Sequence, residues 1–127
     1  MNLRITLLLS TLITIAVVHA VSIEFYLYWK YLWLDIPMHI LGGIACALGF
    51  SALPFFGLKH ASRYTSMMWT ILFTLCVGVV WEMFEFSAGI SQSEPGFFFD
   101  TVLDLVMDVT GGLIGYGVVR SLNASLS

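Results

Sequence analysis

Seven ionisable side chains lie in stretches of the sequence that are otherwise apolar. They are Asp35, His39, Glu82, Glu85, Asp100, Asp104 and Asp108. Neighbours within each stretch are three or four residues apart, as Asp104 and Asp108 are, and on a helix this spacing lets two side chains reach one ion. Carboxylate oxygens with one imidazole suit Mg, Mn, Ca, Fe or Zn. We therefore expect these residues to bind a divalent metal ion.

The acids have little positive charge to balance them. No Lys or Arg falls in the same stretches, and His39 can carry at most one positive charge. A charged group at mid-membrane costs about 2.5–3.5 kcal/mol on insertion scales. Six neighbouring carboxylates repel one another where the dielectric constant is low, so protons, metal ions, or water with solution cations must compensate them. Asp35 and Asp100 also have a simpler interpretation as helix N-caps at the membrane interface.

The composition is that of a membrane protein. Of the 127 residues, 59% are apolar and only 10% are charged, against about 25% in soluble domains. This excludes a disordered segment and an ordinary soluble domain, and a net charge of −3 leaves no basic surface for nucleic acid. Four segments, at about residues 5–23, 35–57, 64–90 and 100–119, have the length to span a bilayer. We predict an all-α, four-helix transmembrane bundle that forms one domain over residues 1–127.

Small residues share a helix face with the ionisable ones in the last three spans. At about 100° per residue, one arc on each helix contains the following residues: Asp35, His39, Gly42, Cys46 and Gly49; Gly78, Glu82, Glu85 and Gly89; Asp100, Asp104, Asp108, Gly111 and Gly115. Small residues let helices approach closely, so the three faces should meet. The acids reach no deeper than roughly 12 Å from one end of the spans. We expect one acidic pocket in one half of the membrane.

The distribution of Lys and Arg predicts the orientation. Lys59, Arg63 and the basic residues near both termini lie on one side, and only Lys30 lies on the other. Both termini should therefore be cytoplasmic, and the acidic pocket should open to the outside. Aromatic residues within 26–33 and at 97–99 would form the outer interfacial belt. Cys46 and Cys76 both lie inside apolar runs, where we expect small core residues and no disulfide.

The first span has an alternative interpretation. Arg4, the apolar run and Val18-His19-Ala20 resemble a signal peptide with its cleavage site. The apolar run is long for a signal peptide, so we favour a retained transmembrane helix.

An ordered set of acids resembles the small bacterial membrane proteins of the YjdF-like group and, more distantly, the VanZ-like proteins. The set is Asp35-x3-His39, Trp81-Glu82-x2-Glu85-Phe86 and Asp100-x3-Asp104-x3-Asp108-x2-Gly111-x3-Gly115. VanZ-like proteins carry Gln near Glu85, Asn near Asp108 and an Arg before the fourth span. This sequence has Glu and Asp at those positions and no such Arg, so it resembles the YjdF-like group more than the VanZ-like proteins. The resemblance implies a compact helical bundle in the bacterial inner membrane, with no established activity.

Three functions are compatible with the sequence. The first is a metal-binding membrane protein, extended to a metal-dependent enzyme on a lipid or lipid-linked substrate. The second is a cation or proton transporter component. The inner halves of the spans contain no ionisable residue that could continue a conducting path, which argues against this function. The third is a structural subunit whose acids bind a basic partner. We expect membrane lipids as partners in each case, and the sequence does not identify the oligomeric state.

Overall fold

The computed structural model describes residues 3–58, 66–88 and 96–124, and every secondary-structure element within them is a helix. The long helices are α1 (Leu3–Glu24), α3 (Asp35–Ala52), α4 (Met67–Ala88) and α5 (Phe97–Ala124). The short elements are α2 (Leu27–Lys30) and the 3-10 helices η1 (Leu32–Leu34) and η2 (Leu53–Phe56). The predicted all-α fold class is confirmed for this part of the chain.

Four helical segments are long and apolar enough to cross a membrane. They are Leu3–Glu24, Leu32–Phe56, Met67–Ala88 and Phe97–Ala124. The 22 residues of α1 extend over about 33 Å, which matches the hydrocarbon core of a bilayer. Prolines lie near both ends of α3, within the second segment. Pro37 is in the first turn of α3, where its missing amide costs no hydrogen bond, and Pro54 lies in η2, just after α3 ends.

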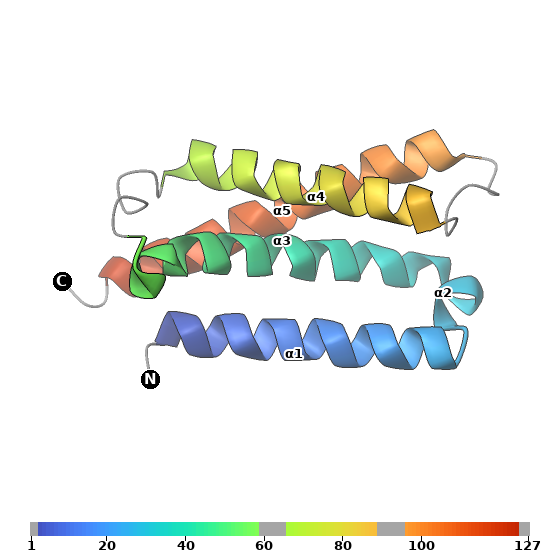
Figure 1. The fold of residues 1–127 in the computed structure, drawn as a ribbon, viewed down its shortest axis with the longest axis horizontal. Coiled ribbons are helices and arrows are strands. Elements are labelled where there is room, and N and C mark those ends of the chain that lie inside the picture. The colour runs from blue at the N-terminus through green and yellow to red at the C-terminus, as the bar shows by residue number, and fades with distance from the viewer. Residues whose placement is uncertain (1–2, 59–65, 89–95, 125–127) are drawn as a thin grey trace.

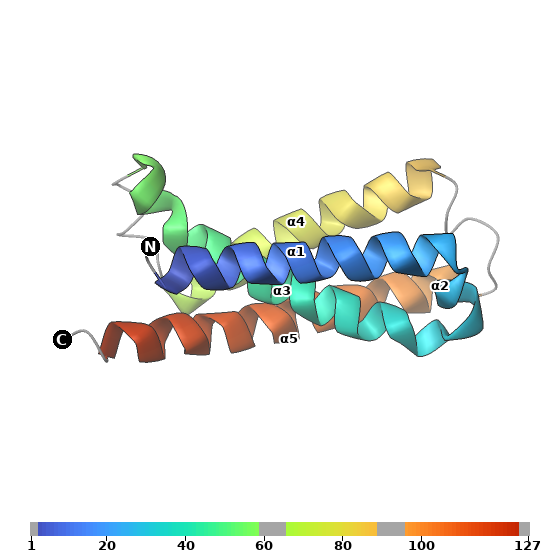
Figure 2. The same cartoon turned by 90° about the horizontal axis from the view of Figure 1, so that it is seen from below.

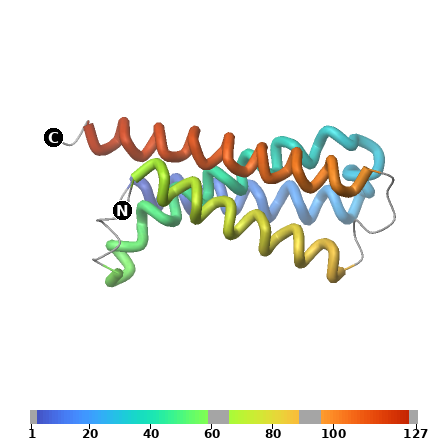
Figure 3. The backbone as a smooth tube through the Cα atoms, turned by 90° about the horizontal axis from the view of Figure 1, so that it is seen from above, coloured from blue at the N-terminus to red at the C-terminus, as the bar shows by residue number. Residues whose placement is uncertain are grey.

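The long helices form a bundle with α3 at its centre. Figure 1 shows α1 and α3 side by side and antiparallel, connected by α2 and η1, while α5 crosses behind α3 and α4. Views from below and from above (Figures 2 and 3) show the oblique crossing of α5. The most extensive contacts of α3 are with α5, and it also packs against α1 and α4.

The start of α1 and the end of α5 lie at the same end of the bundle (Figures 1 to 3). The Arg4 guanidinium donates a hydrogen bond to the Asn123 side-chain oxygen, which joins these two helix ends. The cytoplasmic location of this end stays a prediction. Two of the basic residues behind that prediction, Lys59 and Arg63, lie outside the described residues.

Glycines bring α3 and α5 into backbone contact. A Cβ atom added to Gly43 would lie 2.7 Å from the amide nitrogen of Gly112, and one added to Gly115 would lie 2.7 Å from the Ala47 Cβ. Such distances are too short for any side chain, so only glycine permits this approach. The helices α3 and α5 therefore pack as closely as the small residues in the sequence predict.

The buried face of α3 differs from the predicted arc. Gly42, Cys46 and Gly49 are only half-buried, whereas Gly43 and Ala47 are buried. A Cβ added to Gly49 would meet Leu8 of α1 at 3.8 Å, so this residue faces α1 and not α5. The physical reason is that α3 packs against three helices, and one arc cannot describe a helix that is covered on several sides. On α4, the predicted Gly89 lies outside the described residues.

Candidate metal centre

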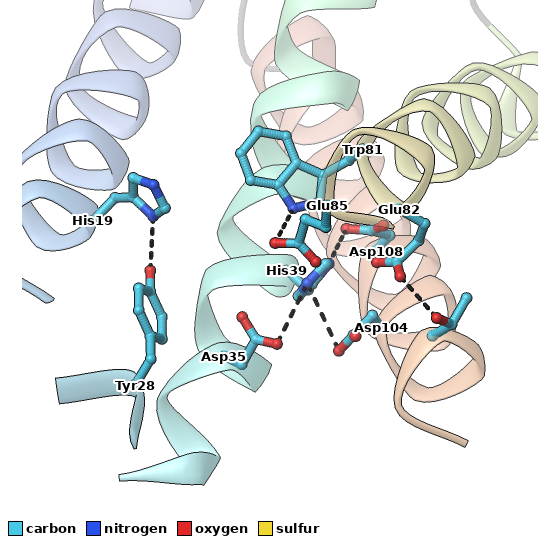
Figure 4. A network of polar contacts seen from close by, with 10 residues as sticks. His19, Tyr28, Asp35, His39, Trp81, Glu82, Glu85, Asp104 and Asp108 are labelled. Atoms are coloured by element: carbon cyan, nitrogen blue, oxygen red, sulfur yellow. Dashed lines mark hydrogen bonds and ion pairs between the residues drawn. The ribbon is translucent and has the colours of Figure 1, made fainter. Parts of the chain in front are cut away.

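A buried histidine is the centre of a carboxylate cluster (Figure 4). His39 is 6% exposed. Its Nε2 atom lies 3.8 Å from Asp35 Oδ2 and 3.7 Å from Asp104 Oδ1. Its Nδ1 atom lies 3.2 Å from Asp108 Oδ1. Three of the predicted acids therefore surround one imidazole ring, two at one nitrogen and one at the other.

Two helices supply this cluster, each through residues one turn apart. Asp35 and His39 belong to the first two turns of α3, and Asp104 and Asp108 belong to α5. The close contact at Gly43 places the two pairs opposite each other, since a larger residue there would strike the backbone of α5. Helical spacing thus selects the residues, and the glycine contact brings them together.

The Asp108 contact favours one tautomer of a neutral imidazole. With His39 neutral and Asp108 ionised, the Nδ1–H group donates to the Asp108 carboxylate, and the lone pair of Nε2 faces Asp35 and Asp104. The distances from Nε2 to those oxygens are too long for hydrogen bonds. A lone pair directed at two anionic oxygens is unfavourable unless a proton or a metal ion lies between them. Metal-ligating histidines have the same arrangement, with their other nitrogen held by a carboxylate.

The ligand atoms have nearly the separation that a metal ion requires. One atom each from Asp35, His39 and Asp104 lie within 4.8 Å of one another. Two ligands at about 2.1 Å from a tetrahedral ion are about 3.4 Å apart. The nitrogen–oxygen distances of 3.7 and 3.8 Å exceed this value by a few tenths of an ångström, and the oxygens of Asp35 and Asp104 lie within 4.8 Å of each other. To hold one metal ion, these side chains would move toward one another.

The two glutamates of α4 lie beside this group. Glu82 is buried, and its Oε2 atom accepts a hydrogen bond from Thr101 Oγ1 at 2.9 Å. Glu85 is half-buried and accepts a hydrogen bond from Trp81 Nε1 at 3.0 Å. Neither belongs to the group of ligand atoms at the Nε2 side of His39. The structure brings both predicted residues to the cluster but gives them other partners.

Asp100 is exposed, and neither it nor Asp35 is an N-cap. The Asp100 amide donates to the Gly96 carbonyl at 3.1 Å, so Asp100 is already inside the helical turn. Asp35 has helical φ and ψ angles of −64° and −41°, and Leu34 occupies the capping position. Asp35 is free to direct its carboxylate at His39, whereas Asp100 lies one turn outside the ligand group.

Two threonines that the sequence analysis did not single out lie near the carboxylates. Thr101 donates to Glu82 from the first part of α5. Thr74 is buried on the face of α4 that also contains Gly78 and Glu82, and its Oγ1 atom has no hydrogen-bond partner. The signal was present in the sequence, since Thr74, Gly78 and Glu82 are spaced by four residues in an apolar helix.

His19 of α1 belongs to a separate contact. Its Nδ1 atom lies 2.9 Å from the Tyr28 hydroxyl, and its ring is 6.2 Å from that of Trp81. Burial, together with the nearby Asp35 carboxylate, raises the pKa of the Tyr28 phenol above its usual value. Tyr28 is therefore turned inward and protonated, unlike Trp29 and Trp33, which are exposed in the predicted aromatic belt.

The cysteines contribute no cross-link. Both Cys46 and Cys76 are free, as predicted, and neither is among the ligand atoms near His39. The prediction that both are core residues is wrong, because Cys46 is half-buried and Cys76 is on an exposed face of α4. The cluster therefore consists of carboxylates, one imidazole and hydroxyl groups, which is a set of hard and borderline donors.

Comparison with known proteins places the chain at the level of a family. No curated protein and no solved structure is detectably similar to it. Residues 1–123 match the family described as "Predicted membrane protein (DUF2238)". That match agrees with the four apolar helices and covers nearly the whole chain. The protein is therefore a membrane protein that belongs to the DUF2238 family.

Proposed function

We propose that this protein binds a divalent metal ion through Asp35, His39 and Asp104. One observation carries the proposal: the His39 ring has Asp108 at Nδ1 and two further carboxylates at Nε2. An orienting carboxylate at one nitrogen and a converging donor set at the other is the arrangement that metal-bound histidines use. The charge of a divalent ion would balance Asp35 and Asp104.

The donor set favours a transition metal among the five ions that the sequence allows. Mg²⁺, Ca²⁺ and Mn²⁺ prefer shells made only of oxygen, whereas an imidazole suits Zn or Fe. Three protein ligands leave a position for water or substrate, as in catalytic zinc sites. An ion held in this way can activate water or polarise a phosphoryl oxygen. A reaction on a lipid or lipid-linked substrate is the extension of this proposal that suits a site within the membrane.

Metal analysis of the purified protein tests this proposal. We expect one zinc ion per chain after incubation with Zn²⁺ and removal of the excess, measured by mass spectrometry of the elements. Asp35→Asn and Asp104→Asn should each lose this ion, because each removes an anionic ligand from His39 Nε2. Glu24→Gln, which neutralises an exposed acid at the end of α1, should retain it.

Failure of the metal proposal has a clear signature. Wild-type protein that holds no stoichiometric metal, and whose melting temperature is unchanged by chelators, would rule it out. Flux of protons or cations in proteoliposomes that depends on Asp104 would then support a transporter component. Co-purification of a basic partner without metal or flux would support a structural subunit.

The location of the site is part of the proposal. The site lies toward the end of the bundle opposite the start of α1 and the end of α5 (Figure 1), and the predicted orientation makes that half of the membrane exoplasmic. We place the protein in the bacterial inner membrane, nearer the YjdF-like group than the VanZ-like proteins. The support is the acidic pair Glu85 and Asp108, where VanZ-like proteins carry Gln and Asn.

A further inference from the structure

Three buried oxygen atoms without hydrogen-bond partners lie on α4 and α5. In the described part of the chain, four buried side-chain polar atoms have no partner: Ser22 Oγ, Thr74 Oγ1, Glu82 Oε1 and Asp108 Oδ2. A buried polar atom without a partner typically costs about 1–3 kcal/mol, and more if it is charged. The last three atoms therefore need something that the protein itself does not supply.

The last three atoms occur on successive turns along the contact between α4 and α5. Thr74, Gly78 and Glu82 follow one another at four-residue intervals on the buried face of α4. Asp108 Oδ2 occupies the space that a side chain on Gly78 would need. A Cβ added to Gly112, one turn further along α5, would lie 2.9 Å from Thr74 Oγ1. The Asp108 carboxylate thus packs against α4 between the turns of Thr74 and Glu82.

The two carboxylates each use one oxygen within the protein and leave the other available. Asp108 Oδ1 accepts from His39 Nδ1 at 3.2 Å, and Glu82 Oε2 accepts from Thr101 at 2.9 Å. Figure 4 shows both carboxyl groups between α4 and α5, with the His39 ring beside them. Glu82 is 7% and Asp108 is 6% exposed, so bulk water does not solvate these atoms. The imidazole separates Asp108 from Asp35 and Asp104.

No basic side chain of these helices compensates the pair. The sequence of α4 contains no Lys or Arg, and the basic residue of α5, Arg120, is twelve positions beyond Asp108, about 18 Å along the helix. A metal ion at His39 Nε2 would balance Asp35 and Asp104, and the carboxyl groups of Asp108 and Glu82 would keep only their hydrogen bonds with His39 Nδ1 and Thr101 Oγ1. Buried charges persist only when they are paired or when they bind metal ions.

We propose that a second divalent cation binds between α4 and α5, held by Glu82 Oε1 and Asp108 Oδ2. Water molecules would complete a shell made only of oxygen. Such a shell selects Mg²⁺ or Mn²⁺, in contrast to the imidazole-containing site. The assignment of one ion to Asp35 and Asp104, and of another to Glu82 and Asp108, rests on the function proposed above. The second site itself rests on the unpartnered oxygens.

Manganese binding to zinc-loaded protein tests the second site. Zn²⁺ first fills the His39 site, and Mn²⁺ is then titrated while free Mn²⁺ is followed by electron paramagnetic resonance. We expect the wild type to bind one Mn²⁺ per chain and Glu82→Gln to weaken this binding roughly tenfold or more, because one of two anionic ligands is lost. Glu82→Gln should keep its zinc, which also shows that the variant is folded. Glu24→Gln, with an exposed acid neutralised, should bind Mn²⁺ as the wild type does.

The two proposals fail separately in this experiment. If the zinc-loaded wild type binds no Mn²⁺, or if Glu82→Gln binds it as tightly as the wild type does, the second site is wrong and the first one stands. If the wild type takes up no zinc, the first proposal is wrong, and the metal-free protein is titrated with Mn²⁺ instead. Binding that is weakened by Glu82→Gln and unaffected by Asp35→Asn then supports the second site, and the absence of such binding overturns it.

Discussion

At the scale of single residues, the imidazole of His39 determines the chemistry of the cluster. Its two nitrogens have different surroundings, since Nδ1 contacts one carboxylate at 3.2 Å and Nε2 faces two others at 3.7 and 3.8 Å. In its neutral form, a histidine arranged in this way would present its Nε2 lone pair to an ion, and the orienting carboxylate would increase the basicity of the ring. In the proposed zinc site, Asp108 is therefore a positioning residue, although it does not contact Nε2.

Removing the charge of Asp108 should weaken zinc binding without abolishing it. Asp108→Asn keeps a hydrogen-bond acceptor for Nδ1 but loses the negative charge, so we expect the dissociation constant of Zn²⁺ to rise about 10–100-fold. Competition with a chromophoric chelator measures this change. Asp100→Asn should bind zinc like the wild type, because Asp100 is exposed and lies outside the ligand group. Equal affinities of wild type and Asp108→Asn would contradict the orienting role.

At the scale of helices, the glycine contact between α3 and α5 positions the ligands. Asp35 and His39 are on one helix, Asp104 and Asp108 are on the other, and no short connection links the two helices. Their separation depends on Gly43 and Gly115, which allow the backbones to touch. Apolar side chains provide little drive for association within lipid, so packing of small residues is the main source of stability here.

Enlarging Gly43 should separate the helices and the ligands together. In Gly43→Ala, the new Cβ would lie 2.7 Å from the Gly112 nitrogen and 2.9 Å from the Asp108 carbonyl carbon, and backbone atoms cannot move aside. We expect the free energy of unfolding to fall by about 1–3 kcal/mol, measured by denaturation in mixed micelles, together with weaker zinc binding.

A second glycine of α5 provides the matched control for this substitution. A Cβ added to Gly117 meets nothing within 4 Å, so Gly117→Ala should be neutral or stabilise the helix by up to about 1 kcal/mol. A Gly43→Ala protein that is as stable as Gly117→Ala, with unchanged zinc affinity, would show that the close contact does not position the site.

At the scale of the whole molecule, the buried ionisable side chains that the structure describes lie toward one end of the bundle. The start of α1 and the end of α5 meet at the opposite end of the bundle, where the Arg4 guanidinium donates a hydrogen bond to the Asn123 side chain. The cluster lies toward the other end, beside the aromatic connection formed by α2 and η1 (Figure 1). A metal ion would therefore enter from the side of the membrane opposite the termini. Between the level of Asp108 and the end of the bundle that contains the termini, the structure describes two buried polar side chains on α4. They are the hydroxyls of Thr70 and Thr74, which are not ionisable.

Reporter fusions test the predicted orientation. We expect green fluorescent protein joined after α5 to fluoresce and alkaline phosphatase joined there to be inactive, because both termini are predicted to be cytoplasmic. Alkaline phosphatase inserted at Phe25, in the turn between α1 and α2, should be active. The reverse pattern would place the candidate metal centre on the cytoplasmic side and would contradict its predicted exposure to the outside.

The sequence by itself determined the membrane environment, the helical fold and the identity of the charged residues. Apolar length is a property of each segment alone, so the four long helices could be predicted without knowing how they pack. The spacing of Asp35 with His39, and of Asp104 with Asp108, likewise follows from the helical repeat. These pairs lie on one face whatever the neighbouring helices do.

Only the tertiary structure decided which members of that set meet and through which atoms. The rotation and crossing of helices depend on contacts between them, so the sequence did not show that Gly43, and not Gly42, faces the backbone of α5. For the same reason, the sequence did not show that Asp100 is exposed whereas Asp104 is buried. It also did not show that the Thr101 hydroxyl donates a hydrogen bond to one oxygen of Glu82. Helical periodicity fixes directions within one helix, whereas a binding site requires distances between helices, and packing alone sets those.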